Sequence, residues 1–152
     1  MNYFKFYIDT LYRLTSQAIK ANEIPISAII VDPKSKKIIA KAHNQTISDS
    51  SPLAHAELIV IKKSLKKLKT KRLDGYDIYC SLEPCAMCAA ALAIAKIRRI
   101  YFCIEDKKSG GFINGVGIAF SKNINHKFSY YYGFEEDKFL KVLKNFFKKK
   151  RN

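Results

Sequence analysis

Apolar residues fall along this chain in two alternating patterns, which predict helices and strands. Spacings of three and four residues between apolar positions are typical of helices, which are expected over residues 3–21, 52–69, 86–96 and 135–149. Short apolar runs bounded by turn residues predict strands over residues 27–31, 37–42, 76–81, 99–104 and 128–132. Strands that alternate with helices in this way are typical of an α/β domain.

The elements fit a single domain over residues 1–152, because no linker and no internal repeat interrupts the pattern. A chain of 152 residues has the common size of one domain and can bury a sizeable core. Residues 32–35 predict a turn that joins the first two strands as a hairpin, and the glycines of 110–117 predict a loop. We therefore expect a three-layer α/β/α fold, with helices on both faces of a mixed five-stranded sheet.

Three side chains in this sequence are of the kinds that bind zinc. Zinc takes Cys and His ligands in tetrahedral geometry, and a catalytic zinc keeps one position open for water. His55, Cys85 and Cys88 supply three ligands, so one Zn²⁺ per chain is expected. The two cysteines lie three residues apart, on one face of a helix that Pro84 begins. His55 lies in the first turn of another predicted helix, which Pro52 begins, so two positive helix ends are expected to meet at the metal.

Glu57 is the candidate catalytic residue, because it lies two residues from the His ligand without being a ligand itself. Zinc lowers the pKa of a bound water toward roughly 7. A carboxylate at this distance can take the proton of that water and deliver protons to a ring nitrogen and a leaving amine. His-x-Glu followed by Pro-Cys-x-x-Cys is the signature of zinc-dependent nucleobase deaminases. The pattern therefore predicts hydrolytic deamination.

Other interpretations of the two cysteines stay open from sequence. A Cys-x-x-Cys pair is also typical of a structural zinc site or of a redox pair. A structural zinc needs a fourth ligand, for which Cys80 and Cys103 are the candidates. Both lie in apolar runs expected to be strands, where a buried and inert thiol is the ordinary explanation. A zinc-stabilised RNA-binding module without catalysis is a further alternative, and the presence of Glu57 argues against it.

The net charge of +15 favours a polyanionic partner such as a nucleic acid. Lys and Arg concentrate at residues 62–72, 98–99 and 148–151. The alternative is a solvated, lysine-rich helix face. That alternative fits Lys62, Lys66 and Lys69, because they lie opposite the apolar positions of the same predicted helix.

No segment of the sequence predicts export or membrane insertion. Residues 1–14 are apolar, but three charged residues interrupt them, unlike the core of a signal peptide. No uninterrupted apolar run approaches the roughly 20 residues of a membrane span. The four cysteines fit metal binding and core packing better than disulfides, as expected in a reducing compartment. We therefore expect a cytoplasmic protein.

Residues 86–95 are almost entirely apolar. A helix that is apolar all round must be buried on every side. The sheet covers one side, and a second subunit is the expected cover for the other. The alternative is that the N- or C-terminal helix of the same chain covers it.

At these residues the chain resembles the bacterial tRNA-specific adenosine deaminases, which belong to the cytidine deaminase superfamily. The resemblance spans residues 23–147, most of the chain. It is carried by these blocks: Glu23-Ile24-Pro25-Ile26, Asn44, Ala54-His55-Ala56-Glu57, Leu82-Glu83-Pro84-Cys85-Ala86-Met87-Cys88-Ala89, Asp106-Lys107, Gly110-Gly111, Asn114-Gly115, Asn125-His126 and Phe146-Phe147. The later blocks discriminate best, because cytosine and guanine deaminases share the zinc motif.

The resemblance implies a cytidine deaminase-like homodimer that converts the wobble adenosine of a tRNA anticodon to inosine. It implies that Glu57 is the proton shuttle and that the active site lies near the subunit interface. Asn44 is implied to hydrogen-bond the flipped base. The residues implied to bind the substrate, the tRNA anticodon stem-loop, are Asn44, Ala54, Asp106, Lys107, Asn125, His126 and Phe146.

Three positions depart from the usual family pattern, namely Ser27, Leu53 and Ser109. None is a metal ligand or the catalytic carboxylate, so they bear on the shape of the pocket more than on the reaction. The alternative function is deamination of a free nucleobase or nucleotide, such as guanine or cytosine. That activity needs neither the charge of +15 nor a basic C-terminal tail.

Overall fold

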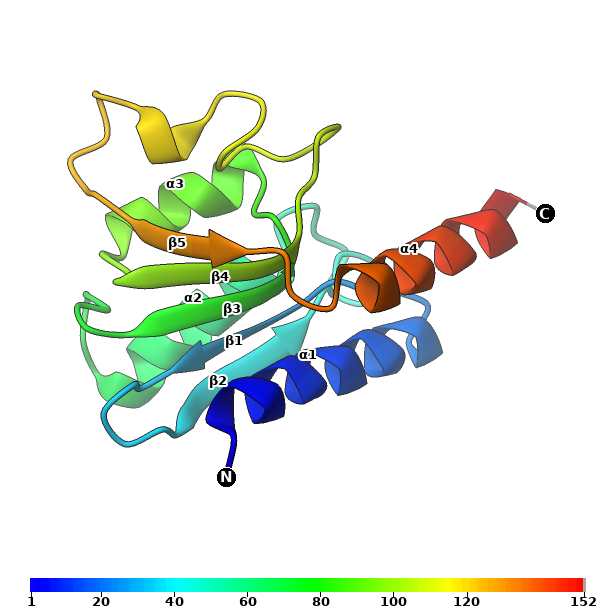
Figure 1. Cartoon of the computed structure of the whole chain (residues 1–152), viewed down its shortest axis with the longest axis horizontal. Coiled ribbons are helices and arrows are strands. Elements are labelled where there is room, and N and C mark those ends of the chain that lie inside the picture. The colour runs from blue at the N-terminus through cyan, green and yellow to red at the C-terminus, as the bar shows by residue number, and fades with distance from the viewer. Residues whose placement is uncertain (152) are drawn as a thin grey trace.

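The computed structural model describes residues 1–151 as helices and strands that alternate along the chain (Figure 1). The helices are α1 (Tyr3–Lys20), α2 (Ala56–Leu68), α3 (Ala86–Ile94) and α4 (Glu136–Arg151), with a short 3-10 helix, η1 (Ile118–Phe120). The strands are β1 (Ser27–Val31), β2 (Ile38–His43), β3 (Asp77–Leu82), β4 (Arg99–Ile104) and β5 (Ser129–Tyr132). Every predicted helix and strand is present, and the predicted bounds of β1 and β4 are confirmed.

The strands form one mixed sheet in the order β2-β1-β3-β4-β5. β1 is antiparallel to β2 and β3, whereas β3, β4 and β5 are parallel to one another. Leu82 and Ile104, which end β3 and β4, are partners in the parallel register. The segments that follow these two strands therefore start side by side at one edge of the sheet, and they carry Cys85 and Asp106.

Helices cover both faces of the sheet, which confirms the predicted three layers. The core between the sheet and the α2–α3 layer includes Ile30, Val60, Ile78, Leu92 and Phe102. The core on the opposite face, under α1 and α4, includes Leu11, Ile29, Tyr79, Cys103 and Phe139. Figure 1 shows α1 and α4 together on one side of the sheet, with α2 and α3 on the other.

The start of α2 corrects the prediction that this helix begins at Pro52. The helix begins at Ala56, and His55 is its N-cap. The preceding residues form turns, in which the Ala54 N–H donates to the Ser51 carbonyl. The side-chain oxygen of Asn44 accepts a hydrogen bond from the Ala56 N–H at 2.9 Å. This contact comes from the end of β2, so it leaves no mark in the local apolar spacing.

The glycines of 110–117 lie in a loop, as predicted, and a short helix that was not predicted, η1, follows directly after it. The N–H of Ile118 donates to the Gly111 carbonyl, and the N–H of Ala119 donates to the Phe112 carbonyl. These bonds fold the segment back on itself, so a short helix follows glycines that local sequence marks as irregular.

α3 buries one side against the sheet and leaves the other side open. Cys88, Ala89 and Leu92 are fully buried, whereas Ile94 keeps 77% of its surface exposed. α1 and α4 lie on the opposite face of the sheet (Figure 1), so the terminal helices do not cover α3. The alternative that a terminal helix of the same chain covers α3 is therefore wrong, and cover by a second subunit stays a prediction.

α4 is anchored mainly near its start. Phe139 is its one fully buried residue, and the helix ends in four consecutive basic residues, Lys148 to Arg151. Figure 1 shows its C-terminal half projecting past the sheet. Neither α4 nor another helix within residues 1–151 is both long and apolar enough to cross a membrane.

Candidate metal centre

The three predicted metal ligands meet between the N-termini of two helices. His55 is the N-cap of α2, Cys85 is the N-cap of α3, and Cys88 lies in the first turn of α3. The Nδ1 atom of His55 lies 3.6 Å from each of the two Sγ atoms. All three ligand atoms lie within 4.8 Å of one another. Two positive helix ends therefore converge on the site, as predicted.

These distances fit a tetrahedral zinc ion. Zinc–sulfur bonds of about 2.3 Å and zinc–nitrogen bonds of about 2.0–2.1 Å, at the tetrahedral angle, place N and S about 3.6 Å apart. The measured distances from Nδ1 to the two Sγ atoms are 3.6 Å. One nitrogen and two sulfur donors leave one tetrahedral position for a solvent molecule. The residues present therefore suit a catalytic zinc site.

The electrostatics of the three side chains favour one thiolate even without a metal ion. The hydrogen bond from the Cys88 thiol lowers the pKa of Cys85 to about 4, and His55 adds to this effect. The same hydrogen bond raises the pKa of Cys88, because the two sulfurs resist ionising together. The hydrogen bond to Cys85 also raises the pKa of His55. A divalent cation at this position would displace these protons, because thiolates and neutral imidazole are the metal-binding forms.

Glu57 lies in the first turn of α2 and is 3% exposed. Its Oε1 atom is buried without a hydrogen-bond partner. Burial raises the pKa of Glu57, although a hydrogen bond with Cys88 opposes the shift. A buried carboxylate oxygen without a partner is costly. Its position beside three zinc donors is what a carboxylate needs in order to accept a proton from a molecule bound there.

The other two cysteines do not join the ligand group. Cys80 and Cys103 are fully buried in β3 and β4, and they belong to the cores on opposite faces of the sheet. This placement confirms the prediction that both are buried in strands. Among residues 1–151, the His–Cys–Cys group therefore lacks a fourth His, Cys, Asp or Glu donor within the same cluster. The arrangement favours a catalytic zinc over a structural one.

The loop of residues 44–54, which leads from β2 to His55, forms one side of the site. Asn44 is 4% exposed, and its side-chain oxygen holds the first turn of α2 through Ala56. Ala54 is buried directly before His55. The carboxylate of Glu23, fully buried, accepts hydrogen bonds from the N–H groups of Ile47 at 3.0 Å and Ser48 at 2.8 Å. The loop is therefore held by side chains from other elements.

The loop of residues 105–115, which follows β4, forms the other side. Asp106 and the exposed Lys107 begin this loop beside the turn that carries Cys85. The side-chain Oδ1 of Asp106 accepts from the N–H groups of Lys108 and Ser109. The structure thus brings Asn44, Ala54, Asp106 and Lys107 to the same edge of the sheet as the metal ligands.

Sequence reasoning assigned no role to the two carboxylates that hold these loops. Glu23 and Glu83 lie in segments that carry the family resemblance, yet nothing local shows that each binds backbone N–H groups more than 20 positions away. One sequence signal exists for Glu83, which is an acidic residue between an apolar strand and Pro84. A charge in such a place is seldom buried without partners.

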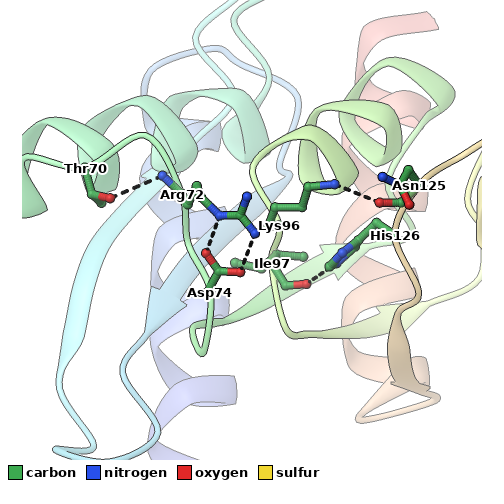
Figure 2. Close-up of polar contacts among 7 residues, drawn as sticks. All are labelled: Thr70, Arg72, Asp74, Lys96, Ile97, Asn125 and His126. Atoms are coloured by element: carbon green, nitrogen blue, oxygen red, sulfur yellow. Dashed lines mark hydrogen bonds and ion pairs between the residues drawn. The ribbon is translucent and has the colours of Figure 1, made fainter.

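Asn125 and His126 contact Lys96 and Ile97, just past the C-terminal end of α3 (Figure 2), whereas Cys85 lies at the N-terminal end of this helix. The Lys96 ammonium donates to the Asn125 carbonyl at 2.7 Å, and the Nε2 atom of His126 lies 2.6 Å from the Ile97 carbonyl. Because α3 spans nine residues, this end is on the order of 14 Å from Cys85. The structure therefore does not bring these two residues to the metal within one chain.

Phe146 lies half-buried in the distal half of α4, against Phe147 and under the Lys150 ammonium. Lys150 also donates to the side chain of Asn22, just past the end of α1. Phe146 therefore belongs to the projecting, basic part of α4 and not to the His–Cys–Cys group.

Comparisons with known proteins agree with this site. The family model of MafB19-like deaminases matches residues 2–151. A tRNA-specific adenosine deaminase of Aquifex aeolicus is 38% identical over 149 residues, which is 97% of this chain and 96% of the relative. Both matches extend well beyond the zinc motif, so the similarity includes the two loops and α4.

Solved structures show the same similarity in three dimensions. A structure from a study of A-to-I editing by tRNA:A34 deaminases at the wobble position superposes with a TM-score of 0.87. It is 33% identical and covers 91% of this chain and 99% of its own. A guanine deaminase of Bacillus subtilis is 32% identical with a TM-score of 0.63, over 69% of this chain and 66% of its own.

Proposed function

Because this chain belongs to the tRNA-specific adenosine deaminases, we propose that it converts the wobble adenosine of a tRNA anticodon to inosine. One observation supports this proposal above the others. The carboxylate of Glu57 is buried and lacks a partner for Oε1, and it lies beside a His–Cys–Cys group with the spacing of zinc ligands. A zinc ion that only stabilises an RNA-binding module does not require a buried carboxylate beside it.

The reaction consumes one water and releases one ammonia. The water oxygen bonds to C6 of adenine, and the bond from C6 to the exocyclic amine breaks. One water proton reaches N1 of the ring and the other leaves with the amine as ammonia. Because both protons must move between water, ring and amine, one side chain has to accept a proton and then give it up.

Glu57 is the residue placed for that task. His55, Cys85 and Cys88 would hold a zinc ion, whose chemistry would be to lower the pKa of a bound water so that hydroxide is available near neutral pH. Burial raises the pKa of Glu57, and this shift brings the pKa closer to the pH at which the enzyme works. Its carboxylate would take the first water proton at Oε1 and deliver it to N1, and would then carry the second water proton to the departing amine.

The two loops beside the metal would hold the flipped adenine. The side-chain oxygen of Asn44 accepts a hydrogen bond from the Ala56 N–H, so its amide N–H₂ group would be the donor toward the base. Ala54 and Leu53 form the approach to His55, and Leu53 keeps 58% of its surface exposed for contact. Asp106 and Lys107 on the facing loop would contact the anticodon nucleotides. A flipped base costs a few kcal/mol to unstack, and such contacts offset this cost.

The remaining charge would bind the stem-loop backbone. α4 carries Lys148 to Arg151 at its projecting end, beside Phe146. Phosphate contacts by Lys and Arg supply most of the sequence-independent affinity for nucleic acid. Asn125 and His126, at the distal end of α3, would lie along a longer RNA path than the one that reaches the metal.

We further propose a homodimer in the cytoplasm. α3 and η1 pack together and expose apolar side chains, including Ile94 at 77% and Phe120 at 64%. Exposed apolar residues gathered on one side of a metal-bearing helix fit a subunit interface. The four free cysteines and the tRNA substrate both fit a reducing, tRNA-containing compartment.

A substrate panel tests the proposed reaction. Purified zinc-loaded protein is incubated with an anticodon stem-loop carrying adenosine at the wobble position and, separately, with guanine, cytosine and adenine. Inosine in the stem-loop, without ammonia from free bases, is the expected result. Ammonia from guanine with an unchanged stem-loop would favour the second candidate function, deamination of a free base. The similarity to a guanine deaminase is the observation that supports this second candidate.

A further inference from the structure

Glu83 is the acceptor at the centre of the densest hydrogen-bond cluster around the metal site. It is 3% exposed and lies at the end of β3, two residues before Cys85. Its Oε1 atom accepts from the Asp106 N–H at 3.0 Å and from the Asn114 side-chain amide at 2.6 Å. Its Oε2 atom accepts from the backbone N–H groups of Phe112, Ile113 and Asn114 at 3.0–3.2 Å.

All five donors belong to the 105–115 loop, and none is a Lys or Arg side chain. A buried carboxylate without a cationic partner is stable only when several donors satisfy it. The donors come from both ends of the loop, so the carboxylate closes it as a ring. Glu83 thus fixes a loop of eleven residues from a position outside that loop.

Close packing of Gly110 and Gly111 also holds the 105–115 loop against residues 83–86, independently of the hydrogen bonds to Glu83. The Gly111 N–H donates to the Pro84 carbonyl at 3.1 Å. A Cβ atom on Gly111 would lie 2.2 Å from the backbone N of Ala86, and one on Gly110 would lie 2.7 Å from the carboxylate of Glu83. Only glycine permits these approaches. The loop therefore lies directly on the turn that carries the metal ligand Cys85.

We propose that Glu83 is a positioning residue that sets the RNA-contacting face of the 105–115 loop relative to the metal. The inference rests on the proposed function, because Asp106 and Lys107 of this loop are the residues assigned to the anticodon. Glu83 ties their backbone to the segment that ends at Cys85. The distance between the recognition loop and the reacting centre is thereby set by one side chain that touches neither substrate nor metal.

Glu83→Gln tests this role. The amide keeps one acceptor oxygen and places two N–H donors where N–H groups of the loop now point, so the ring of hydrogen bonds opens. The matched control is Glu105→Gln, because Glu105 lies on the same loop, loses the same charge and accepts a single bond from Asn114 at 3.2 Å. Asn114→Ala is the milder variant, because it removes only the side-chain donor to Glu83.

Amide hydrogen exchange is the first readout, since it does not depend on activity. We expect faster exchange at Asp106, Phe112, Ile113 and Asn114 in Glu83→Gln, with β3 and α3 protected as in the wild type. Asn114→Ala should show the same pattern with smaller amplitude, and Glu105→Gln should match the wild type. Unchanged exchange in both Glu83→Gln and Asn114→Ala would overturn the proposal.

Kinetics on the anticodon stem-loop are the second readout. Glu83→Gln should keep one zinc per chain and raise KM by about tenfold, with kcat within about threefold of the wild type, as expected when a binding interaction is lost. A loss of zinc, or a fall in kcat without a change in KM, would show that Glu83 serves the metal turn instead. If the wild type makes no inosine, the proposed function fails, and the exchange experiment still decides whether Glu83 holds the loop.

Discussion

The Nδ1 atom of His55 and the Sγ atom of Cys85 lie 3.6 Å apart, although 30 positions separate the two residues in sequence. Each is the N-cap of a helix, and the two helices lie on the same face of the sheet. The fold therefore presents two positive helix ends and two ligand types to one point. This relationship brings a His and a distant Cys-x-x-Cys pair close enough to hold one metal ion.

Cys85→Ser and Cys88→Ser should each lose zinc and lower the thermal stability. A serine hydroxyl stays protonated at neutral pH and is a poor zinc ligand, and the remaining thiolate then lacks its counter-charge. Metal analysis and thermal denaturation check this outcome. Cys103→Ser is the control, because Cys103 is buried in the other core and should leave the zinc content unchanged. Full zinc occupancy in either ligand variant would remove that residue from the ligand set.

Glu23→Gln should make the stability less dependent on pH. Burial alone would raise the pKa of Glu23, but the N–H donors of Ser48 and Ile47 outweigh it and hold the pKa below its ordinary value. A lowered folded-state pKa contributes stability that is present above the unfolded value of about 4.3 and lost as the pH falls through the folded value. At pH 7 the variant should be less stable by about 1–3 kcal/mol, and this difference should shrink below about pH 4.

Urea unfolding of the wild type and Glu23→Gln at several pH values measures this difference. Asp49→Asn is the control, because Asp49 is exposed on the same loop and only its backbone is hydrogen-bonded there. A stability difference that stays constant from pH 7 to the acid range would exclude Glu23 as the cause.

How far the sequence could predict this molecule depends on whether the relevant contacts are local. β1 and β4 are each an apolar run preceded by one polar residue, Ser27 or Arg99, so local sequence was enough to predict their bounds. The start of α2 depends on the hydrogen bond that the Ala56 N–H donates to the side-chain oxygen of Asn44, whereas local spacing placed the start at Pro52.

The closeness of His55, Cys85 and Cys88 could be predicted, because their spacing is that of a known motif. The hydrogen bonds of Glu83 could not, because they depend on the parallel pairing of β3 and β4.

The surface was the hardest part to predict. The apolar α3 indicated that something besides the sheet covers it, and local sequence left a second subunit and a terminal helix both open. Both terminal helices pack on the other face, so Ile94 stays exposed in the single chain. Asn125 and His126 resemble a family block, yet only the fold shows that they contact the C-terminal end of α3 (Figure 2). Sequence similarity indicates that such residues are shared, and the fold decides what they touch.

Ile94→Asp should convert the protein to a monomer. A charge in the centre of an apolar interface is unpaired and desolvated, which strongly disfavours association. Light scattering after size-exclusion chromatography gives the mass of the wild type and the variant. Ile19→Asp is the control, because Ile19 is 44% exposed on α1, on the other side of the sheet. A monomeric wild type, or a dimer that survives Ile94→Asp, would contradict the α3 interface.

Deleting residues 148–152 should weaken binding of the anticodon stem-loop without changing the zinc content. The deletion removes four basic residues from the projecting end of α4. Each lost phosphate contact lowers the salt dependence of binding, so the slope of log K against log salt should become shallower by roughly one for each contact. Fluorescence anisotropy from low to high salt measures both effects. Affinity of the full chain that does not change with salt would show that the charge of +15 is only a solvated surface.

The most direct measurement compares the wild type with Glu57→Gln on one substrate, an anticodon stem-loop with adenosine at the wobble position. Nucleoside mass spectrometry measures inosine, while zinc content and stem-loop affinity are measured on the same samples. We predict that the wild type forms inosine. Glu57→Gln should have the same zinc content and stem-loop affinity but a deamination rate lower by about 100- to 10,000-fold, because the amide cannot carry a proton. A wild type that forms no inosine, or a Glu57→Gln variant with near-normal turnover, would contradict the account.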